Sequence, residues 1–420
     1  MESTRSNPSP AQDSRDPASV VIDGMCPSAV VTPQTPTEVA EALADAAERG
    51  LGVAPVGGGT ALALGNPPER LDVALSLERL TGILAYEPTD LTLSVAAGSR
   101  FADVQAVLAE HGQTLPIDVP EPERATIGGL IATALAGPRR YGLGTLRDLL
   151  IGISVAHPTG AVSKAGGMVV KNVSGFDLMR LYHGSLGTLA VIVSANFKVM
   201  PLPRFESTIQ ASYATLSGAL AAADRVRGSR VRPAALEVAQ TDGRWLLAAR
   251  IEGREETVRL LARECSDLLA AEATTLDAGD SAAWWAGYIK EESLARHERG
   301  VTVRLGTVSK RLGEVLTRAT ELATEHELPL EAIHVSPGLG AALLKIGGEA
   351  DEATVARFHQ WRESLLGLTD YLTVMRAPVE FKRGIDVWGK PPATLDVMRA
   401  LKQEFDPTRV LNPGRFAGGI

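Results

Sequence analysis

Short apolar segments separated by glycine-rich turns make up the first half of the chain. Residues 53–56, 149–156 and 189–193 are almost entirely apolar, and residues 91–95 alternate between apolar and polar positions. Apolar runs of this length predict buried strands, and alternation predicts a strand with one buried face. The pattern therefore predicts short strands broken by turns. It does not match the regular strand–helix alternation of a doubly wound sheet.

Two helices are predicted among these strands. Thr35 followed by Pro36 and Glu38 is typical of a helix start, with Thr35 as the N-cap and Glu38 as the capping-box partner. Gly50 can end this helix in a left-handed conformation. Ser99 is predicted to cap the second helix. The apolar positions of that helix are Val104, Val107 and Leu108.

The pattern changes after Pro203. Amphipathic spacing over 214–228 and 254–271 predicts two helices rich in Ala and Leu, and a further helix is predicted over 393–405. Strands are predicted at 234–239, 245–251, 301–305, 343–346 and 371–376.

The predicted fold class is α+β, with a domain boundary near residues 203–205. Residues 1–19 are rich in Ser, Pro and Asp and have no apolar pattern, so they are predicted to form a disordered tail. The predicted organisation is a tail (1–19), an N-terminal domain (20–203), a second α+β domain (204–392) and a C-terminal segment (393–420).

Composition excludes several classes of protein. The net charge of −8 argues against a broad cationic face for nucleic acid. Two cysteines, Cys26 and Cys265, are too few for a disulfide scaffold or for a cysteine-ligated iron–sulfur cluster held by this chain alone. No apolar run reaches the ~18 residues of a membrane span, and no secretory signal pattern is present. A cytoplasmic location is therefore the expectation.

The first chemical signal is the turn Pro55–Thr60, which contains three consecutive glycines after a strand. Glycines allow close approach of the backbone to a ligand, and successive N–H groups can form a concavity that binds a diphosphate. The spacing matches neither a Walker loop nor Gly-x-Gly-x-x-Gly. A flexible turn without a ligand explains the same residues equally well.

Two further glycine clusters follow. Residues 125–133 contain Gly128-Gly129 and lead into residues 137–142, where Arg139 or Arg140 could balance a phosphate or polarise a ring carbonyl. The paired glycines could also merely start a tightly packed helix. In the third cluster, residues 166–192, Ser174 is predicted to cap a helix over 175–182. Gly184 and Gly187 are predicted to form the turn into the next strand.

These three clusters, in this order, resemble the FAD-binding domain of the vanillyl-alcohol oxidase/p-cresol methylhydroxylase (PCMH-type) superfamily. Within it, residues 137–148, 166–191 and 406–416 are similar to the FAD-binding subunits of bacterial glycolate oxidases. The sequence similarity is weak between about residues 205 and 370. The resemblance implies a PCMH-type domain of two α/β subdomains over 20–203, a smaller cap domain, and a C-terminal segment that packs back on the first domain.

The resemblance also implies a set of FAD-binding residues. The loop at Val56–Thr60 would bind the diphosphate through backbone amides, Val191 would lie at the adenine, and Asn412 would close the flavin side. The full predicted set is Val56, Gly57, Gly58, Gly59, Thr60, Pro116, Thr126, Ile127, Gly128, Gly129, Thr133, Gly137, Pro138, Arg140, Tyr141, Gly142, Gly187, Val191 and Asn412.

This sequence departs from relatives in two respects. Some relatives attach FAD through a histidine in the first loop, where Thr60 stands here, and neither cysteine falls near a second tether, so the FAD is predicted to be non-covalent. Related 2-hydroxy-acid dehydrogenases carry a metal-binding histidine cluster, whereas the seven histidines here show no close pair, so no metal is predicted. The catalytic base is unknown. The candidates near a substrate are Arg140, Tyr141, Lys171 and His183, each with a solvated or structural role as the alternative.

The implied function is an FAD subunit of a glycolate oxidase complex, which oxidises glycolate to glyoxylate with a catalytic flavoprotein subunit and an iron–sulfur subunit as partners. In such a reaction the hydroxy acid passes a hydride to the flavin, a base takes the hydroxyl proton, and a cation holds the carboxylate. Two alternatives stay open. One is a stand-alone FAD oxidoreductase for another alcohol or hydroxy acid, and the other is a non-catalytic scaffold.

Overall fold

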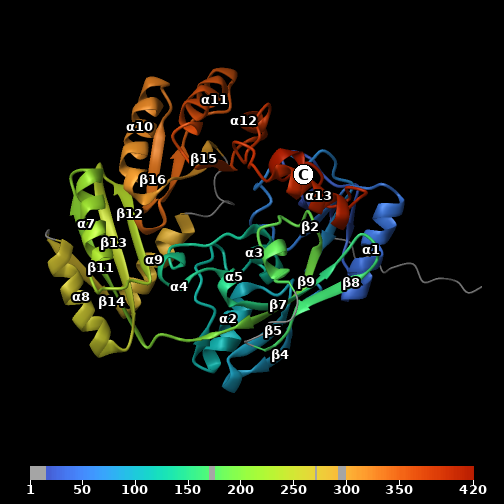
Figure 1. Cartoon of the computed structure of the whole chain (residues 1–420), viewed down its shortest axis with the longest axis horizontal. Coiled ribbons are helices and arrows are strands. Elements are labelled where there is room, and N and C mark those ends of the chain that lie inside the picture. Colours follow the sequence, from blue (N-terminus) through green and yellow to red (C-terminus); the bar gives the residue numbers. More distant parts are fainter. Residues whose placement is uncertain (1–15, 170–175, 270–271, 292–298) are drawn as a thin grey trace, which may run out of the picture.

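The computed structural model describes residues 16–169, 176–269, 272–291 and 299–420. The chain folds into an N-terminal domain and a second, cap domain, which stand side by side with the C-terminal helix packed on the N-terminal domain (Figure 1). The chain leaves the first domain after Pro201 and enters the cap sheet at Phe205.

A small parallel sheet begins the N-terminal domain. Its strand order is β1 (Ala29–Val31), β3 (Val73–Ser76) and β2 (Val53–Val56). The helix α1 (Pro36–Glu48) follows β1, and the Thr35 side chain accepts the Glu38 N–H as its N-cap. The Glu38 carboxylate accepts from the backbone of Gln34 at 2.7 Å, one residue before the position that the capping box predicts. Gly50 has a φ of +67°, as expected for a left-handed helix end.

An antiparallel five-stranded sheet forms the rest of this domain. Its order is β4 (Ile83–Glu87), β5 (Thr92–Ala96), β9 (Val191–Lys198), β7 (Leu150–Ala156) and β8 (Val162–Gly166). Side chains of α1, α2 (Phe101–Glu110) and α3 (Ile127–Thr133) join it in one hydrophobic core. The remaining elements are short: β6 (Gln113–Thr114), which pairs with β10 (Met200–Pro201), α4 (Arg140–Leu143), α5 (Leu146–Leu149) and α6 (Met179–Tyr182).

The cap domain contains the larger sheet, eight antiparallel strands. The order is β14 (Ala273–Asp277), β11 (Phe205–Tyr213), β13 (Arg244–Gly253), β12 (Ala235–Thr241), β16 (Leu330–Ser336), β17 (Ala341–Ile346), β15 (Val301–Gly306) and β18 (Tyr371–Arg376).

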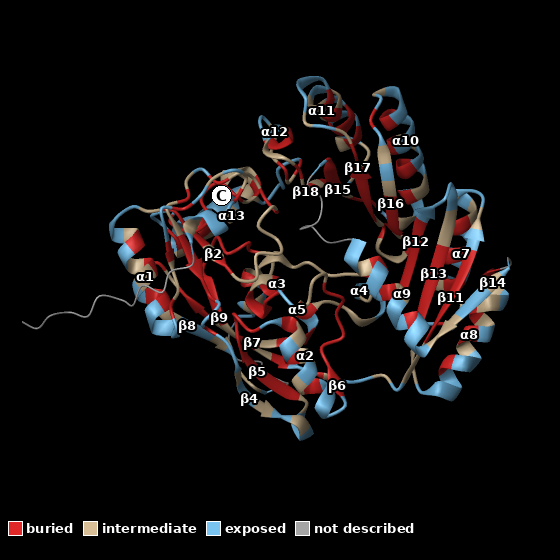
Figure 2. Ribbon diagram, turned by 180° about the vertical axis from the view of Figure 1, so that it is seen from behind, coloured by how far each residue is buried: buried red, intermediate tan, exposed pale blue. Residues whose placement is uncertain are grey.

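The two faces of the cap sheet differ. The outer face is apolar and is covered by α7 (Leu216–Gly228), α8 (Glu255–Leu269), α10 (Leu312–Glu325) and α11 (Glu352–Leu366). Figure 2 shows these helices with their buried sides against the strands and their exposed sides outward. The inner face bears α9 (Ala278–Glu291), which lies between the cap sheet and α4 of the N-terminal domain (Figures 1 and 2).

The C-terminal segment returns to the N-terminal domain. After α12 (Val379–Lys382) and α13 (Leu395–Phe405), the chain runs parallel to β2. Backbone hydrogen bonds join Val53 N–H to Val410 O at 2.8 Å and Asn412 N–H to Val53 O at 2.9 Å. This return was expected from the resemblance, and so was the mixed fold.

Two sequence predictions about local structure need correction. Ser99 does not cap α2, because Arg100 takes the N-cap position without a side-chain bond and the Ser99 hydroxyl accepts from Gly82 N–H at 2.9 Å. The chain between 205 and 213 is the strand β11, which the pattern did not single out. Ser174 lies outside the described residues. Within the described ranges, no helix is both long enough and apolar enough to cross a membrane.

Candidate functional site

A pocket lies where four segments of the N-terminal domain and the C-terminal tail meet. These are the turn after β2, the start of α3, the turn before β9, and Asn412 with Arg415. The pocket has an empty volume of about 860 Å³ including its open side. Its concave lining of glycines and apolar side chains, with a few polar groups, is typical of a small-molecule or cofactor site.

The glycine loop, Gly57–Gly59, forms one wall of this pocket. A Cβ added at Gly57 would lie 2.1 Å from Oγ1 of Thr126, and one at Gly58 would lie 1.6 Å from the carbonyl oxygen of Arg124. Gly59 has a φ of +75°. The loop is therefore pressed against the segment that precedes α3, and only glycine fits at Gly57 and Gly58. The resulting wall presents backbone to the pocket.

The start of α3 forms a second wall, next to the glycine loop. The Thr126 hydroxyl caps the helix by accepting from Gly129 N–H at 3.3 Å. A Cβ at Gly128 would lie 2.9 Å from that of Ala97, so Gly128 allows close packing of α3 on the end of β5. The sequence left open whether Gly128 allows helix packing or approaches a ligand. In the structure it allows α3 to pack closely and it also lines the pocket.

The turn before β9 closes the third side. Leu186 and Gly187 adopt φ values of +53° and +66°. The turn is fixed to α3 by hydrogen bonds from Gly184 N–H to Ile131 O and from Leu186 N–H to Ala132 O, at 2.9 and 2.8 Å. Its position allows Gly187, Val191 and Ile192 to line the pocket.

The C-terminal tail supplies an amide and a guanidinium to the pocket, in addition to the hydroxyls of Thr60, Thr126 and Thr133. Lys402, 4% exposed, donates to Thr188 O, to Leu411 O and to the Asp406 carboxylate at 2.8, 2.9 and 2.6 Å. Burial lowers the pKa of Lys402, while Asp406 opposes that shift. This buried pair anchors the tail, whose Asn412 side chain donates to Leu186 O at 2.7 Å.

Arg415 is the cation of the pocket. It is 3% exposed, and its Nη2 donates to the carbonyl oxygens of Leu62 and Leu64 at 2.5 and 2.6 Å. Burial lowers its pKa to about 10, and nearby Asp23 opposes the shift. Arg415 therefore stays charged at neutral pH.

These walls fit a flavin dinucleotide. The glycine loop leaves bare backbone of the kind that binds a diphosphate. Among the described residues, nothing donates to Asn412 Oδ1 and nothing accepts from Arg415 Nε, although both side chains are buried and both residues line the pocket. Buried polar atoms are normally hydrogen-bonded, so these two indicate a ligand with complementary groups.

A second chamber adjoins the pocket and reaches the cap sheet. It shares Thr60, Ala125, Leu130 and Leu135 with the first pocket and has an empty volume of about 590 Å³ with its opening. Its polar wall residues are Asp118, Glu121 and Arg304, and Arg304 comes from cap strand β15. The chamber therefore lies where a substrate could reach both the cofactor pocket and the cap.

A buried charge cluster, the interface network, joins the two domains beside this chamber. Arg250 pairs with Glu252 at 2.9 Å and with Glu206, and lies 3.8 Å from Asp118. Arg139 pairs with Asp118 and with Glu252, each at 3.2 Å. Burial raises the pKa of Glu252, against the opposing effect of the two arginines. The network holds the Asp118 carboxylate in place at the chamber wall.

The predicted FAD residues fall into two groups. Those that line the pocket are Val56, Gly57, Gly58, Gly59, Thr60, Thr126, Gly128, Gly129, Thr133, Gly187, Val191 and Asn412. Those placed elsewhere are Pro116, Ile127, Gly137, Pro138, Arg140, Tyr141 and Gly142.

Residues 137–142 of the second group have identifiable positions. Gly137 lines the second chamber. Arg140 is exposed, and Tyr141 packs against Gly338 and the core of the cap domain. A Cβ at Gly142 would meet the backbone of Pro233 and Ala234. This segment therefore fixes the cap to the N-terminal domain in the structure.

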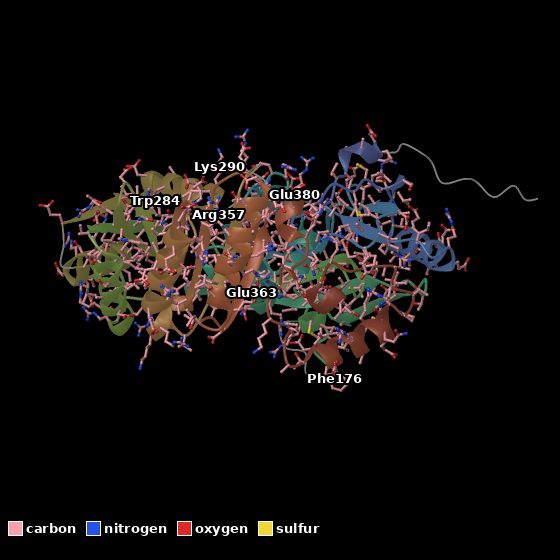
Figure 3. All side chains as sticks on the ribbon, turned by 90° about the horizontal axis from the view of Figure 1, so that it is seen from above. Phe176, Trp284, Lys290, Arg357, Glu363 and Glu380 are labelled. Atoms are coloured by element: carbon pink, nitrogen blue, oxygen red, sulfur yellow. The ribbon has the colours of Figure 1, made fainter. Side chains whose placement is uncertain are left out.

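His183, another catalytic candidate, lies away from the pocket. His183 lines a separate hollow with Met398 and Leu401, and burial lowers its pKa. Lys171 lies outside the described residues. Phe176, from the same motif, is 91% exposed and lies at the margin of the N-terminal domain (Figure 3).

Sequence reasoning missed charged residues of the site, among them Arg415, Arg304 and Asp118. Arg415 directly follows Asn412-Pro413-Gly414, and that turn motif could have identified it. The other two carry no local signal, because tertiary packing of the cap brings them to the chamber. Across the described ranges, no group of three or more His, Cys, Asp or Glu side chains could hold a metal ion.

Two known families match the N-terminal segments and the C-terminal tail that form this site. The family described as "FAD binding domain" matches residues 27–175, and the one described as "FAD linked oxidases, C-terminal domain" matches residues 388–416. The chain therefore carries an FAD-binding domain and a segment of the C-terminal domain of FAD-linked oxidases, and its cofactor is FAD.

Individual relatives cover most of the chain at low identity. Glycolate oxidase subunit GlcD of Bacillus subtilis is 25% identical over 93% of this chain and 89% of its own length. A D-lactate dehydrogenase of Archaeoglobus fulgidus is 27% identical over 92% and 90%. Glycolate oxidase subunit GlcE of Escherichia coli is 42% identical, but over 29% of this chain and 35% of its own length.

The fold has solved counterparts. A structure of alkyldihydroxyacetonephosphate synthase superposes with a TM-score of 0.68 and 19% identity, over 92% of this chain and 76% of that one. At this identity the similarity concerns the fold.

Proposed function

We propose that this chain is the FAD-binding subunit of a glycolate oxidase, which oxidises glycolate to glyoxylate and passes the electrons to partner subunits. The broader class is an FAD-linked oxidoreductase for the CH–OH group of hydroxy acids, which agrees with the relatives named above. The observation that carries the proposal is the backbone-walled pocket, which adjoins a chamber with an arginine from the cap.

The chamber contains a cation for the carboxylate of a small hydroxy acid, beside the carboxylates of Asp118 and Glu121. Arg304 supplies a cation that can hold a carboxylate through paired N–H groups. Leu135 and Leu343 provide apolar walls that limit water near the reacting carbon. FAD, when bound, supplies the two-electron acceptor for the hydride of the α-carbon.

The partner proposal rests on the relatives and on the cysteine content. The matches to GlcD and GlcE support a multi-subunit oxidase. With only Cys26 and Cys265, an iron–sulfur cluster would have to reside on another chain. Cys26 is exposed, Cys265 is buried and neither lines the pocket, which supports non-covalent FAD.

A second candidate is a stand-alone dehydrogenase of another 2-hydroxy acid. The near full-length match to a D-lactate dehydrogenase favours it. The two candidates differ in substrate and in the need for partners.

The test is the visible spectrum of the purified chain under anaerobic conditions, before and after addition of glycolate, D-lactate or D-2-hydroxyglutarate. A yellow protein that is bleached by glycolate only when it is co-purified with partner subunits would support the first proposal. Bleaching of the isolated chain by another hydroxy acid would support the second. A protein that retains FAD and is bleached by none of them, alone or in a complex, would contradict both. FAD released into the supernatant by acid precipitation would support non-covalent binding.

A further inference from the structure

The tail turn, Asn412–Arg415, places two polar side chains at the same pocket. Proline at the second position and a glycine with a φ of +83° at the third are typical of a type II turn. Arg415 N–H donates to Asn412 O at 3.2 Å, which closes the turn. The backbone of its first residue therefore lies close to that of its last, and both residues line the pocket.

The charge of Arg415 is not balanced by a hydrogen-bonded carboxylate among the described residues. Its Nη2 donates to the carbonyl oxygens of Leu62 and Leu64, which are neutral. The nearby carboxylate of Asp23 accepts instead from Lys382 Nζ at 2.7 Å. Lys382 and Asp23 have side chains 0% and 5% exposed, so one buried carboxylate faces two buried cations. An uncompensated buried cation is costly, and an electron-rich group in the pocket would offset that cost.

The unpaired acceptor of Asn412 limits which part of FAD can bind beside this turn. A diphosphate offers oxygen acceptors, and these would repel Asn412 Oδ1. The pyrimidine edge of the flavin ring offers an N–H between two carbonyl oxygens, so it can donate to Asn412 and accept from Arg415 at once.

The position of Arg415 agrees with the ring end of the cofactor. Leu64 packs with Leu186 and Leu343, and Leu135 packs against the same cluster. Leu343 and Leu135 line the second chamber. Arg415 therefore donates hydrogen bonds to Leu62 and Leu64, which follow the glycines of the loop on the side of the second chamber.

We propose that Asn412 and Arg415 bind the pyrimidine edge of the flavin ring, and that the charge of Arg415 stabilises the reduced flavin. Charge placed near the ring nitrogens is a recognised way for a protein to tune a flavin. Two-electron reduction with uptake of one proton leaves a negative charge on the ring, and a fixed cation favours that state. The inference rests on FAD binding by this pocket, as the proposed function does, but it is independent of the substrate.

The test compares the midpoint potential of FAD bound to the wild type and to Arg415→Gln, by equilibration with a reference dye during reduction with dithionite. We expect the ratio of reduced to oxidised flavin at a given potential to fall ten- to hundredfold, or ~30 mV for each tenfold step. Arg415→Lys keeps the charge and should recover at least half of the shift. Arg409→Gln is the matched control, since Arg409 is in the same tail, is half exposed and pairs with Glu69. Its potential should equal that of the wild type.

Asn412→Asp keeps the inference testable if Arg415→Gln does not fold. It adds an acceptor and a negative charge at the same edge, and should lower the potential as well. An unchanged potential in a folded Arg415→Gln protein with a full complement of FAD would overturn the proposal. So would a loss of affinity for ADP as large as that for FAD, because that result would assign Arg415 to the diphosphate. A wild type that is reduced by dithionite but by no hydroxy acid would contradict the proposed function alone.

Discussion

The glycine-walled pocket and the inner face of the cap sheet are built in opposite ways. The pocket is formed mainly by backbone and small side chains, and its amide and guanidinium side chains come from one short tail turn. The inner cap face is formed by side chains with charge, including Arg250, Glu252, Arg304 and Lys345. The first surface suits a cofactor with many acceptor oxygens. The second depends on exact pairing of buried charges, so the two should respond differently to substitution.

Arg250→Met should have the largest effect on the charged face. The side chain is 4% exposed, and its loss leaves Asp118, Glu206 and Glu252 with Arg139 as their remaining cation in the network. Breaking a buried ion network by removal of one partner costs about 3–5 kcal/mol. Urea denaturation should show a decrease of this size in the free energy of unfolding.

Arg244→Met is the matched control on the same strand, where the arginine is exposed and bonds to Ser212. It should change stability by less than about 0.5 kcal/mol. Equal stability of the two variants would show that the network does not hold the domains together.

Gly58→Ala tests the backbone wall. The added methyl group would lie 1.6 Å from the Arg124 carbonyl oxygen, so the loop must move away from α3. Strain of about 3 kcal/mol corresponds to roughly a 100-fold loss of FAD affinity. Fluorescence titration of the apoprotein with FAD measures this loss.

Gly228→Ala provides the control, because Gly228 ends α7 with open space at its Cβ position. Its FAD affinity should not change. Retention of full FAD by Gly58→Ala would mean that the loop has room that the structure does not show.

A third test of the charged cap face is the loss of folding stability at acid pH. Burial and the nearby Lys345 lower the pKa of His334 from 6.5 to about 4. Between these values the unfolded chain binds more protons than the folded one, so stability is complete above pH 6.5 and falls toward pH 4. The shift corresponds to ~3 kcal/mol at most. Relative to the wild type, His334→Gln should lose less stability over this range, as measured by urea denaturation at several pH values. A constant difference from pH 7 to 4.5 would contradict the assignment.

The contrast between the two surfaces explains what the sequence could predict. Glycines at 57–59, 128 and 187 are required by close contacts or by a positive φ, so their clusters could be recognised in the chain. The end of α1 at Gly50 was predictable for the same reason. Such features depend on residues that are neighbours in the sequence.

Features that depend on distant residues could not be predicted in this way. Arg304 and Asp118 meet at the chamber although they are far apart in the chain, and neither has a local motif. Ser99 has the residue type of a helix cap, but its hydroxyl is engaged by Gly82 N–H, so tertiary packing overrides the local preference. Arg415 lies between the two cases: its turn was visible in the sequence, whereas its burial was not.

The smallest expected effect is that of Arg140→Gln. Arg140 was expected among the FAD-binding residues, yet it is exposed and does not line the pocket. We therefore expect FAD affinity and substrate turnover to change by less than about twofold, since exposed arginines away from a site contribute little. Gly137→Ala, whose Cβ would lie 2.6 Å from that of Asp118 at the chamber wall, should lower turnover much more. If Arg140→Gln instead weakened FAD binding tenfold while Gly137→Ala did not, the segment would have to turn toward the flavin on binding. The division between a backbone-built cofactor pocket and a side-chain-built cap face would then not hold at their junction.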